Sequence, residues 1–460
     1  MMPQQTNTTT RASLWPGLLT MILFVLVPYS YAAFTGTPQP ETSGLARVHS
    51  AAESIYCVKG ISPVTSILLI ELAVLLIVVL WAWLKQGEPG GKTAVFHQHG
   101  WYLFTLALLI AIPFIIAWQT NSSPCTRGKA FFWQSIYIDV FILAILALSY
   151  NLMFGFTGVV SFGHAAFFGT GAYAVGLFMK HLEWPWWLAI LASLLLGILI
   201  ALIKGFVGLR IKGLYFALFT LAFAEVFFLL AGNRIMVNIT GAEDGFTFTV
   251  PDWLNMTKNR LFFYYLTLTF LTLAFITIYR LMHSPTGSVL SALRDNEERA
   301  QMIGYNTFHF KLLAIVLAGI MATMAGILRG LALKGASPNV LGLDFTMNPL
   351  LMSIVGGVAT FSGPVIGAFM LRLTEQLLRD SIITIGTLSL NIGDHWTLIL
   401  GIIFILSVMA FPHGIVGTWL SKNLHTRNGW ITLFQRPKTN KDTFVQSSHP
   451  PSSTKHKETS

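Results

Sequence analysis

Few ionisable side chains lie within the apolar runs of this 460-residue chain, and four stand out: Glu71, Asp139, His164 and Glu225. They form neither a nucleophile paired with a general base nor a set with metal-ligand spacing. The segment QGEPGGKT, residues 86–93, nearly matches a phosphate-binding loop, but it lacks the first glycine and follows an apolar run rather than a strand. The sequence therefore predicts no catalytic site, no metal site and no cofactor bound by this chain.

An ionisable side chain at the centre of a membrane costs about 2.5 to 3.5 kcal/mol, so each of the four is a functional candidate. Two readings stay open for Glu225: a structural hydrogen bond, or a place on the path of a solute. His164 follows a glycine turn, and we expect it to cap backbone groups. Asp139 is expected to contact water near the outer third of its span, and Glu71 to pair with a neighbour.

The composition indicates an integral membrane protein. Hydrophobic residues make up 54% of the chain, charged residues only 10%, and the mean hydropathy is +0.65. No period-two alternation suggests a barrel, so we predict an all-α fold with about 10–11 transmembrane helices. Apolar runs near spanning length are Leu14–Phe34, Ser62–Leu84, Trp101–Trp118, Phe131–Met153, Val160–Lys180, Trp184–Ile203, Leu214–Gly232, Leu261–Met282, Phe310–Leu333 and Trp396–Phe411.

One charged segment, residues 284–306, separates two of these runs. Ser284 is a plausible N-cap, Pro285 suits the first helical position, and Gly304 could end the helix. The pattern predicts one amphipathic helix of about five turns. Its apolar side comprises Val289, Leu290, Leu293, Ala300 and Ile303. Taken alone, this pattern also fits a solvated linker helix.

The residues ALRDNEERAQMIG within this segment resemble the cytoplasmic coupling helix of ATP-binding-cassette importer permeases of the branched-chain amino acid (LivM-like) family. In that family the helix docks into a groove of the nucleotide-binding subunit. The resemblance implies that the apolar side of the helix buries against the ATPase. It also assigns ATPase coupling to Arg294, Asp295, Asn296, Glu297, Ala300 and Gly304.

Three further stretches resemble the same family: residues 149–178, with the run GHAAFFGTGAY; GLRIKGLYFALFTLAFAEVFFLL, with Glu225; and TGAEDGF, residues 240–246. The last carries Ala242 where the family has glycine, which leaves the local backbone conformation open. Small residues at steps of three and four predict close helix packing. Candidates for the translocation path or for helix packing are Ser161, Gly163, His164, Gly169, Glu225, Gly356 and Gly357. Candidates in the outer loop are Thr240, Gly241 and Gly245.

Basic residues favour the cytoplasmic side. We expect the protein in a bacterial inner membrane. On its cytoplasmic side we place the 284–306 segment, the loop with Lys204, Arg210 and Lys212, and the basic C-terminal tail. A single crossing at 350–371 would put the tail on the wrong side. Gly356, Gly357, Gly363 and Pro364 break that run, so residues 347–378 are expected to enter and leave on the outer side, or to form two short spans.

We predict three parts: an N-terminal extension with about three transmembrane helices (1–130), a LivM-like permease domain (131–420) and a disordered basic tail (421–460). Cys57 and Cys125 are expected on the outer side, either as a disulfide or as two free thiols. Leu18–Pro28 resembles a signal peptide, but we expect the first span to be retained.

Three kinds of protein remain: a permease subunit of an ATP-driven importer, a secondary transporter or channel, and a membrane enzyme. The family resemblance favours the first. It implies partnership with a second LivH-like permease subunit, two ATPase subunits that bind ATP and magnesium, and a periplasmic solute-binding protein, without nucleic acid. The implied solutes are branched-chain amino acids, with urea, short amides or other small carboxylates as the alternative.

Overall fold

The computed structural model describes residues 105–106, 108–113, 115–116, 129–211, 213–379, 382–385, 388–391, 396–411 and 414–418. The chain divides into two compact units, residues 1–417 and 418–460, and the following description concerns the first. Most of the predicted N-terminal extension, with Glu71, Cys57 and Cys125, lies outside the described residues, as does the predicted tail.

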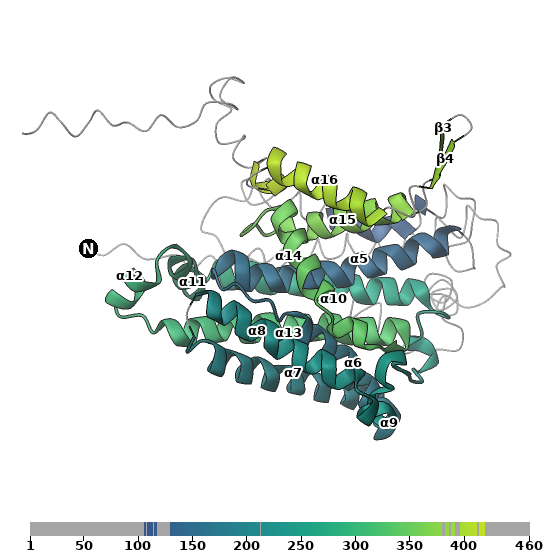
Figure 1. Cartoon of the computed structure of the whole chain (residues 1–460), viewed down its shortest axis with the longest axis horizontal. Coiled ribbons are helices and arrows are strands. Elements are labelled where there is room, and N and C mark those ends of the chain that lie inside the picture. The colour runs from purple at the N-terminus through teal and green to yellow at the C-terminus, as the bar shows by residue number, and fades with distance from the viewer. Residues whose placement is uncertain are drawn as a thin grey trace, which may run out of the picture. The chain divides into compact units, whose positions relative to one another are not determined.

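Helices account for most of the described chain, as the apolar runs predict (Figure 1). Six are long and apolar enough to cross a membrane, counting described residues only. They lie within 132–156, 186–208, 214–232, 260–282, 307–333 and 397–418. The longer helices are α5 (Lys129–Asn151), α6 (Ala165–His181), α7 (Trp186–Gly208), α8 (Leu214–Gly232), α10 (Arg260–Met282), α13 (Thr307–Leu333), α14 (Asp344–Gly356), α15 (Gly363–Arg379) and α16 (Trp396–Ala410).

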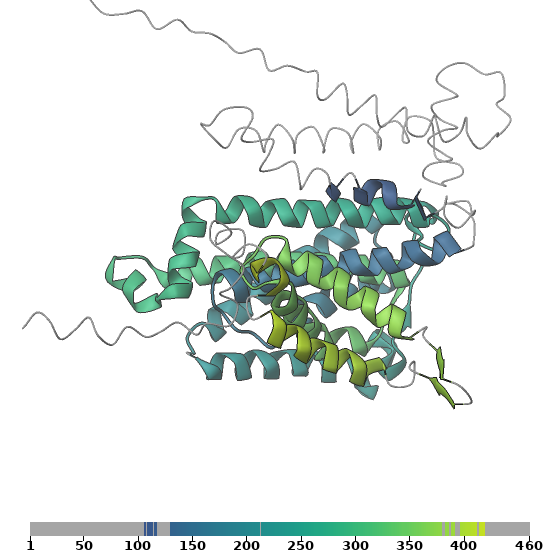
Figure 2. The same cartoon turned by 90° about the horizontal axis from the view of Figure 1, so that it is seen from above.

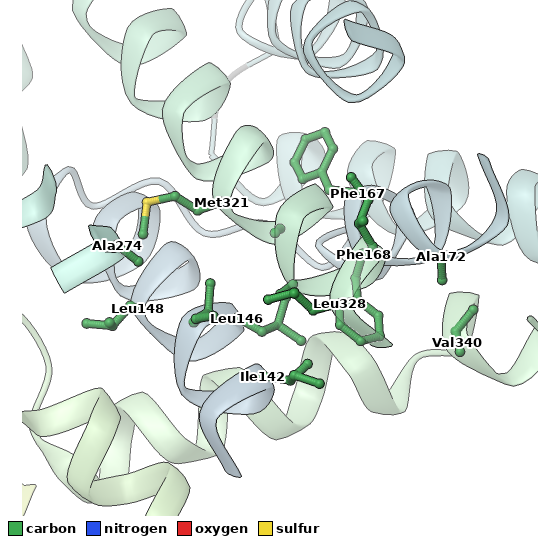
Figure 3. Packing of buried hydrophobic residues seen from close by; sticks show 14 of the residues in the cluster. Ile142, Leu146, Leu148, Phe167, Phe168, Ala172, Ala274, Met321, Leu328 and Val340 are labelled. Carbon is green, nitrogen blue, oxygen red and sulfur yellow. The ribbon is translucent and has the colours of Figure 1, made fainter. Parts of the chain in front are cut away.

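The core lies where α5, α6 and α13 meet. α6 packs against α13 and α7, while α5 packs against α10, α13, α14 and α15. Ile142 and Leu146 of α5, Phe168 of α6 and Leu328 of α13 are almost fully buried in this cluster (Figure 3). Small residues bring α6 and α13 together, because a side chain at Gly171 or Gly326 would overlap the backbone of the other helix.

Short elements mark the two ends of the bundle. α11 (Pro285–Asp295) and α12 (Glu297–Met302) project at one end, and α9 (Val237–Thr240) and the hairpin of β3 (Ile382–Ile385) and β4 (Leu388–Asn391) lie at the other (Figures 1 and 2). β1 (Phe246–Thr247) pairs antiparallel with β2 (Gly335–Ala336), with Phe246 opposite Ala336. This pairing ties the loop after α8 to the loop after α13.

The glycine-rich run near residue 356 is broken, as predicted. α14 and α15 pack against each other as an antiparallel pair, joined by a turn in which Gly357 has φ +130°. A side chain at Gly356 would overlap the Gly363 carbonyl, so the close approach requires glycine. The Phe361 ring in the turn packs on Tyr279, in the last turn of α10, which places the turn near the α11 end.

Candidate functional site

The charged segment forms two helices rather than the single helix that we predicted. Ser284 caps α11 through a hydrogen bond from the Gly287 N–H (3.4 Å), with Pro285 in the first position. Asn296 then leaves the helical region (φ −162°, ψ 103°), and its side-chain oxygen accepts a hydrogen bond from the Arg299 N–H (2.9 Å). Asn296 therefore ends α11 and caps α12, a role that its preference for N-cap positions could have indicated.

The apolar side of this segment packs on its own chain. Val289, Leu290, Leu293 and Ala300 are buried in a cluster with Ala314 of α13, and Leu281, Met282 and Phe310 pack against it. The expectation that these residues bury against a partner is therefore wrong. The amphipathic pattern correctly predicts that these four residues are buried. It does not identify the surface that covers them.

Another apolar surface remains open at the end of α12. Met302 is 86% exposed, Ile303 71% and Tyr305 45%, and we call these three residues the α12 tip. Gly304, with φ +99°, turns the chain there, and the Tyr305 N–H bonds to the Ala300 carbonyl (3.2 Å). Exposed polar residues flank the tip on α11 and α12: Arg294, Asp295, Asn296, Glu298 and Arg299. Glu297 is half-buried and pairs with Lys311 of α13 (2.6 Å).

The α11–α12 segment contacts a non-helical stretch inside the bundle, residues 157–164. α5 continues as a π-helix over Leu152–Phe156, and the chain then has no regular secondary structure up to His164, so the predicted span Val160–Lys180 is helical only from Ala165. Gly158 (φ +71°) lies against Arg294, whose Cγ would be 3.4 Å from a Cβ at this position. Gly158 thus brings the non-helical stretch against the α11–α12 segment.

Neighbouring helices satisfy the backbone of this non-helical stretch. The Thr220 hydroxyl of α8 accepts a hydrogen bond from the Phe162 N–H (3.0 Å), and the Thr346 hydroxyl of α14 accepts one from the Ala165 N–H (2.9 Å). A side chain at Gly163 would overlap the Thr220 carbonyl. Ser161 is fully buried, and its hydroxyl accepts a bond from the Gly163 N–H (3.4 Å). Non-helical backbone at membrane depth is tolerated where protein groups replace the missing helical bonds.

Lys204 supplies a further bond to this stretch. We expected it in a cytoplasmic loop, but α7 extends to Gly208 and Lys204 is fully buried. Its Nζ donates to the Gly163 carbonyl (2.8 Å) and lies 4.3 Å from the centre of the Phe167 ring. A cation–π contact of this kind compensates part of the loss of hydration. Sequence reasoning missed Lys204 because nearby Arg210 and Lys212 made the region resemble a basic loop.

His164 does not cap the helix that it precedes. Its side chain makes no capping bond to α6; instead Nε2 lies 2.7 Å from the Ser149 hydroxyl of α5. The ring is fully buried, with Nδ1 unpaired within the described part of the chain, and it packs edge-on against Tyr150. His164 thus ties the start of α6 to α5. Gly169, a second candidate, packs against Leu341, where a side chain would overlap the leucine.

Asp139, which we expected to contact water, forms ion pairs with two arginines. Its carboxylate pairs with Arg329 of α13 and with Arg372 of α15 (3.0 Å), and only 22% of its side chain is exposed. Arg372 also pairs with Glu375 (2.7 Å), which pairs in turn with Arg379 (2.7 Å). These residues link three helices through charge-assisted hydrogen bonds. Sequence spacing could not pair them, because the partners lie 190 and 233 residues from Asp139.

Glu225 is exposed on α8 and makes no hydrogen bond or ion pair with any residue that the structure describes. The structural hydrogen bond that we considered is therefore not found within the described residues. Of the other path candidates, Gly356 ends α14 and Gly357 begins the α14–α15 turn, which Asn151 contacts further along. The Asn151 side chain accepts a bond from the Ala359 N–H (3.0 Å) and donates one to the Thr360 carbonyl (3.0 Å).

The loop after α8 contains the TGAEDGF stretch. Thr240 donates to the Ala231 carbonyl (2.8 Å) and accepts from the Ala242 N–H (3.3 Å). Gly241 and Gly245 adopt φ of +73° and +71°, and Ala242 adopts +50°. Ala242 therefore takes a left-handed conformation that glycine would reach without steric cost.

No group of three or more potential metal ligands occurs in the part of the chain that the structure describes. The arrangement is that of a helical bundle with a projecting two-helix segment, a non-helical stretch behind it and buried polar contacts between helices. Such an arrangement can transmit a displacement of the segment to the bundle interior.

The amino-acid sequence of this chain is similar to those of known transport proteins. A family model described as "Branched-chain amino acid transport system / permease component" matches residues 133–408. The high-affinity branched-chain amino acid transport system permease protein LivM of Salmonella typhimurium is 24% identical, over 68% of this chain and 74% of the relative. A probable LivM permease of Methanocaldococcus jannaschii is 24% identical (59% and 89%), and LivH of Escherichia coli is 22% identical (60% and 91%). No solved structure matches the chain.

Proposed function

This chain belongs to the branched-chain amino acid transport permease family, and from that membership we propose that it forms part of the membrane pathway of an ATP-driven importer of branched-chain amino acids. It is a multi-pass membrane protein and a permease component. On this proposal the chain itself does no catalysis, and ATP with magnesium is bound and hydrolysed by separate ATPase subunits.

The α12 tip is the observation that carries the proposal. Three apolar side chains, Met302, Ile303 and Tyr305, are exposed at the end of a segment whose larger aliphatic residues, Val289, Leu290 and Leu293, are buried on their own chain. Charged residues surround them. An apolar centre with a polar rim is the usual composition of a protein interface, so we propose that the tip inserts into the ATPase groove. The α11–α12 end then faces the cytoplasm of a bacterial inner membrane, together with the C-terminus.

The remaining partners follow from the relatives. Because proteins named LivM and LivH both match this chain, we propose a second permease of the same kind as its partner, with a periplasmic solute-binding protein delivering the solute. The relatives' names favour branched-chain amino acids. Urea, short amides and other small carboxylates remain the second candidate class of solute.

The test uses the whole importer: this chain, the second permease, the ATPases and the binding protein, reconstituted in liposomes. Ile303→Asp should reduce co-purification of the ATPases and ATP-dependent uptake of leucine by about tenfold, because an aspartate is costly to bury in an apolar groove. Ile235→Asp is the matched control, since Ile235 is 84% exposed on the loop after α8, at the other end of the bundle. It should leave ATPase binding unchanged.

Two results would contradict the proposal. The first is normal ATPase co-purification by Ile303→Asp at normal expression. The second is leucine uptake by the isolated chain without ATPases, which would favour a stand-alone transporter. Uptake of urea but not of leucine by the complete importer would keep the coupling role and replace the solute.

A further inference from the structure

α8 exposes one continuous side. Residues at steps of four, three and four lie on that side: Leu218, Ala222, Glu225 and Leu229. Leu218 is 51% exposed and Leu229 61%, and Ala222 and Glu225 are exposed as well. The opposite side, with Ala217, Thr220 and Ala224, is buried in the chain's own bundle, where Thr220 supports the non-helical stretch.

The length and composition of α8 are those of a membrane-spanning helix, and in such a helix the side chain of Glu225 is too short to extend to the membrane surface. It lies in the interior of α8, about two turns or ~10 Å from the nearer end of the helix. The glutamate side chain is much shorter than that. A carboxylate exposed to hydrocarbon without a partner is strongly disfavoured, so a bare lipid-facing side is a poor environment for Glu225.

Other exposed helix sides have the composition that lipid requires. On α7, Leu191, Leu195 and Leu199 are between 52% and 59% exposed, and on α16 Leu398, Ile405 and Met409 are between 59% and 76% exposed. Neither of these exposed sides carries an ionisable residue in the described chain. The exposed side of α8 differs from those of α7 and α16 because it carries the carboxylate of Glu225.

We propose that this side of α8 is covered by a transmembrane helix of the second permease subunit, which presents a hydrogen-bond donor or a cation to Glu225. The inference rests on the proposed function, because it requires that second subunit. The spacing of Leu218, Ala222, Glu225 and Leu229 matches the seam of two packed helices, and the small Ala222 allows close approach beside the carboxylate. A complementary charge or donor would offset part of the cost of burying Glu225.

Accessibility in the membrane tests this assignment. A spin label is attached to Ala222→Cys in a chain with Cys57→Ser and Cys125→Ser, and to Leu199→Cys on α7 as the matched control. In the reconstituted importer, collision of oxygen with the label at 222 should be several-fold lower than at 199. In the chain expressed without the second permease, the two positions should be alike.

Equal accessibility at 222 and 199 in an active importer would overturn the proposal. Protection at 222 in the chain expressed alone would also overturn it, because another part of this chain or a second copy would then be the cover. If the wild-type importer shows no ATP-dependent uptake of any solute, the proposed function fails, and this inference falls with it. An active wild-type importer therefore separates the two failures.

Substitution of Glu225 gives a second measurement, for which a lipid-facing position and a subunit interface predict different results. Glu225→Leu would suit a lipid-facing position, so co-purification of the second permease would stay unchanged. At an interface it leaves the partner's donor unpaired, and we expect co-purification to fall about tenfold while Glu225→Gln, which keeps an acceptor, stays within about threefold of wild type. Leu199→Ala should have no effect. Unchanged co-purification by Glu225→Leu would overturn the proposal.

Discussion

The Arg372 guanidinium lies 3.0 Å from the Asp139 carboxylate, although 233 residues separate them in the chain. Arg329 approaches the same carboxylate from a third helix. Two guanidiniums on one carboxylate hold α5, α13 and α15 together, and because little of these side chains is exposed, water screens the charges weakly.

Asp139→Asn should therefore lower the free energy of unfolding of the purified permease by about 1 to 3 kcal/mol. The substitution leaves Arg329 and Arg372 without their shared counter-charge. The loss of stability is smaller than for a fully buried pair, because 22% of the Asp139 side chain is exposed. Thermal unfolding in detergent measures the effect. The control is Asp252→Asn, which breaks an exposed pair with Lys258 and should change stability by less than about 0.5 kcal/mol.

Thr220→Val tests the backbone of the non-helical stretch. Valine keeps the shape of threonine but removes the oxygen that accepts from the Phe162 N–H, which leaves a buried donor unpaired. We expect a loss of about 1 to 3 kcal/mol in unfolding free energy. Thr277→Val is the comparison, because the exposed Thr277 hydroxyl bonds to the Leu273 carbonyl of its own helix turn and, among the described residues, supports no other segment. Equal effects of the two substitutions would contradict the prediction.

Gly163→Ala should be poorly tolerated for a steric reason. The added methyl group would overlap the Thr220 carbonyl, so α8 or the stretch must shift, at a cost of about 1 to 3 kcal/mol. Gly401→Ala in α16 is the control, since a Cβ there meets nothing within 4 Å. Yield and thermal unfolding of both variants should be compared. Wild-type stability of Gly163→Ala would show that the overlap relaxes without cost.

Ala242→Gly should raise stability, unlike most alanine-to-glycine changes. Ala242 has φ +50°, where the side chain costs about 1 to 2 kcal/mol, while glycine gains freedom in the unfolded chain worth about 0.4 to 1 kcal/mol. The net expectation is a gain of about 0.5 to 1 kcal/mol. Ala224→Gly, within α8, should instead lose about 1 kcal/mol or more. A loss at both positions would refute the strain at Ala242.

Much of the helical framework could be predicted from apolar run length, because backbone groups in lipid allow few alternatives. Leu214–Gly232 has the predicted bounds, and the break near Gly356 follows from its glycines and proline. The prediction failed where tertiary contacts replace local bonds. Residues 160–164 are apolar enough for a helix, yet they are not helical, because Thr220 bonds the Phe162 N–H and Lys204 bonds the Gly163 carbonyl in place of helical bonds.

The candidate site was predicted less completely. The helical character of residues 284–306 was predicted from their charges and caps, but the surface that covers their apolar side was not, because an amphipathic pattern fits any apolar neighbour. The pairing of Asp139 with Arg329 and Arg372 depends on which helices adjoin, and local spacing contains no such information. Asn296 is the exception, since its N-cap preference could have divided the segment into α11 and α12.

Leu290 and Leu293 are buried against the ends of α10 and α13, so the α11–α12 segment is firmly attached to these two helices. A protein that pulls on the α12 tip cannot swing the segment alone without opening this apolar contact. A force on the tip would instead act on α13, whose 27 residues extend about 40 Å. On the proposed coupling role, a small tilt of α13 at the α11 end would produce a larger displacement at its far end, where the β1–β2 pairing joins the loop after α13 to the loop after α8.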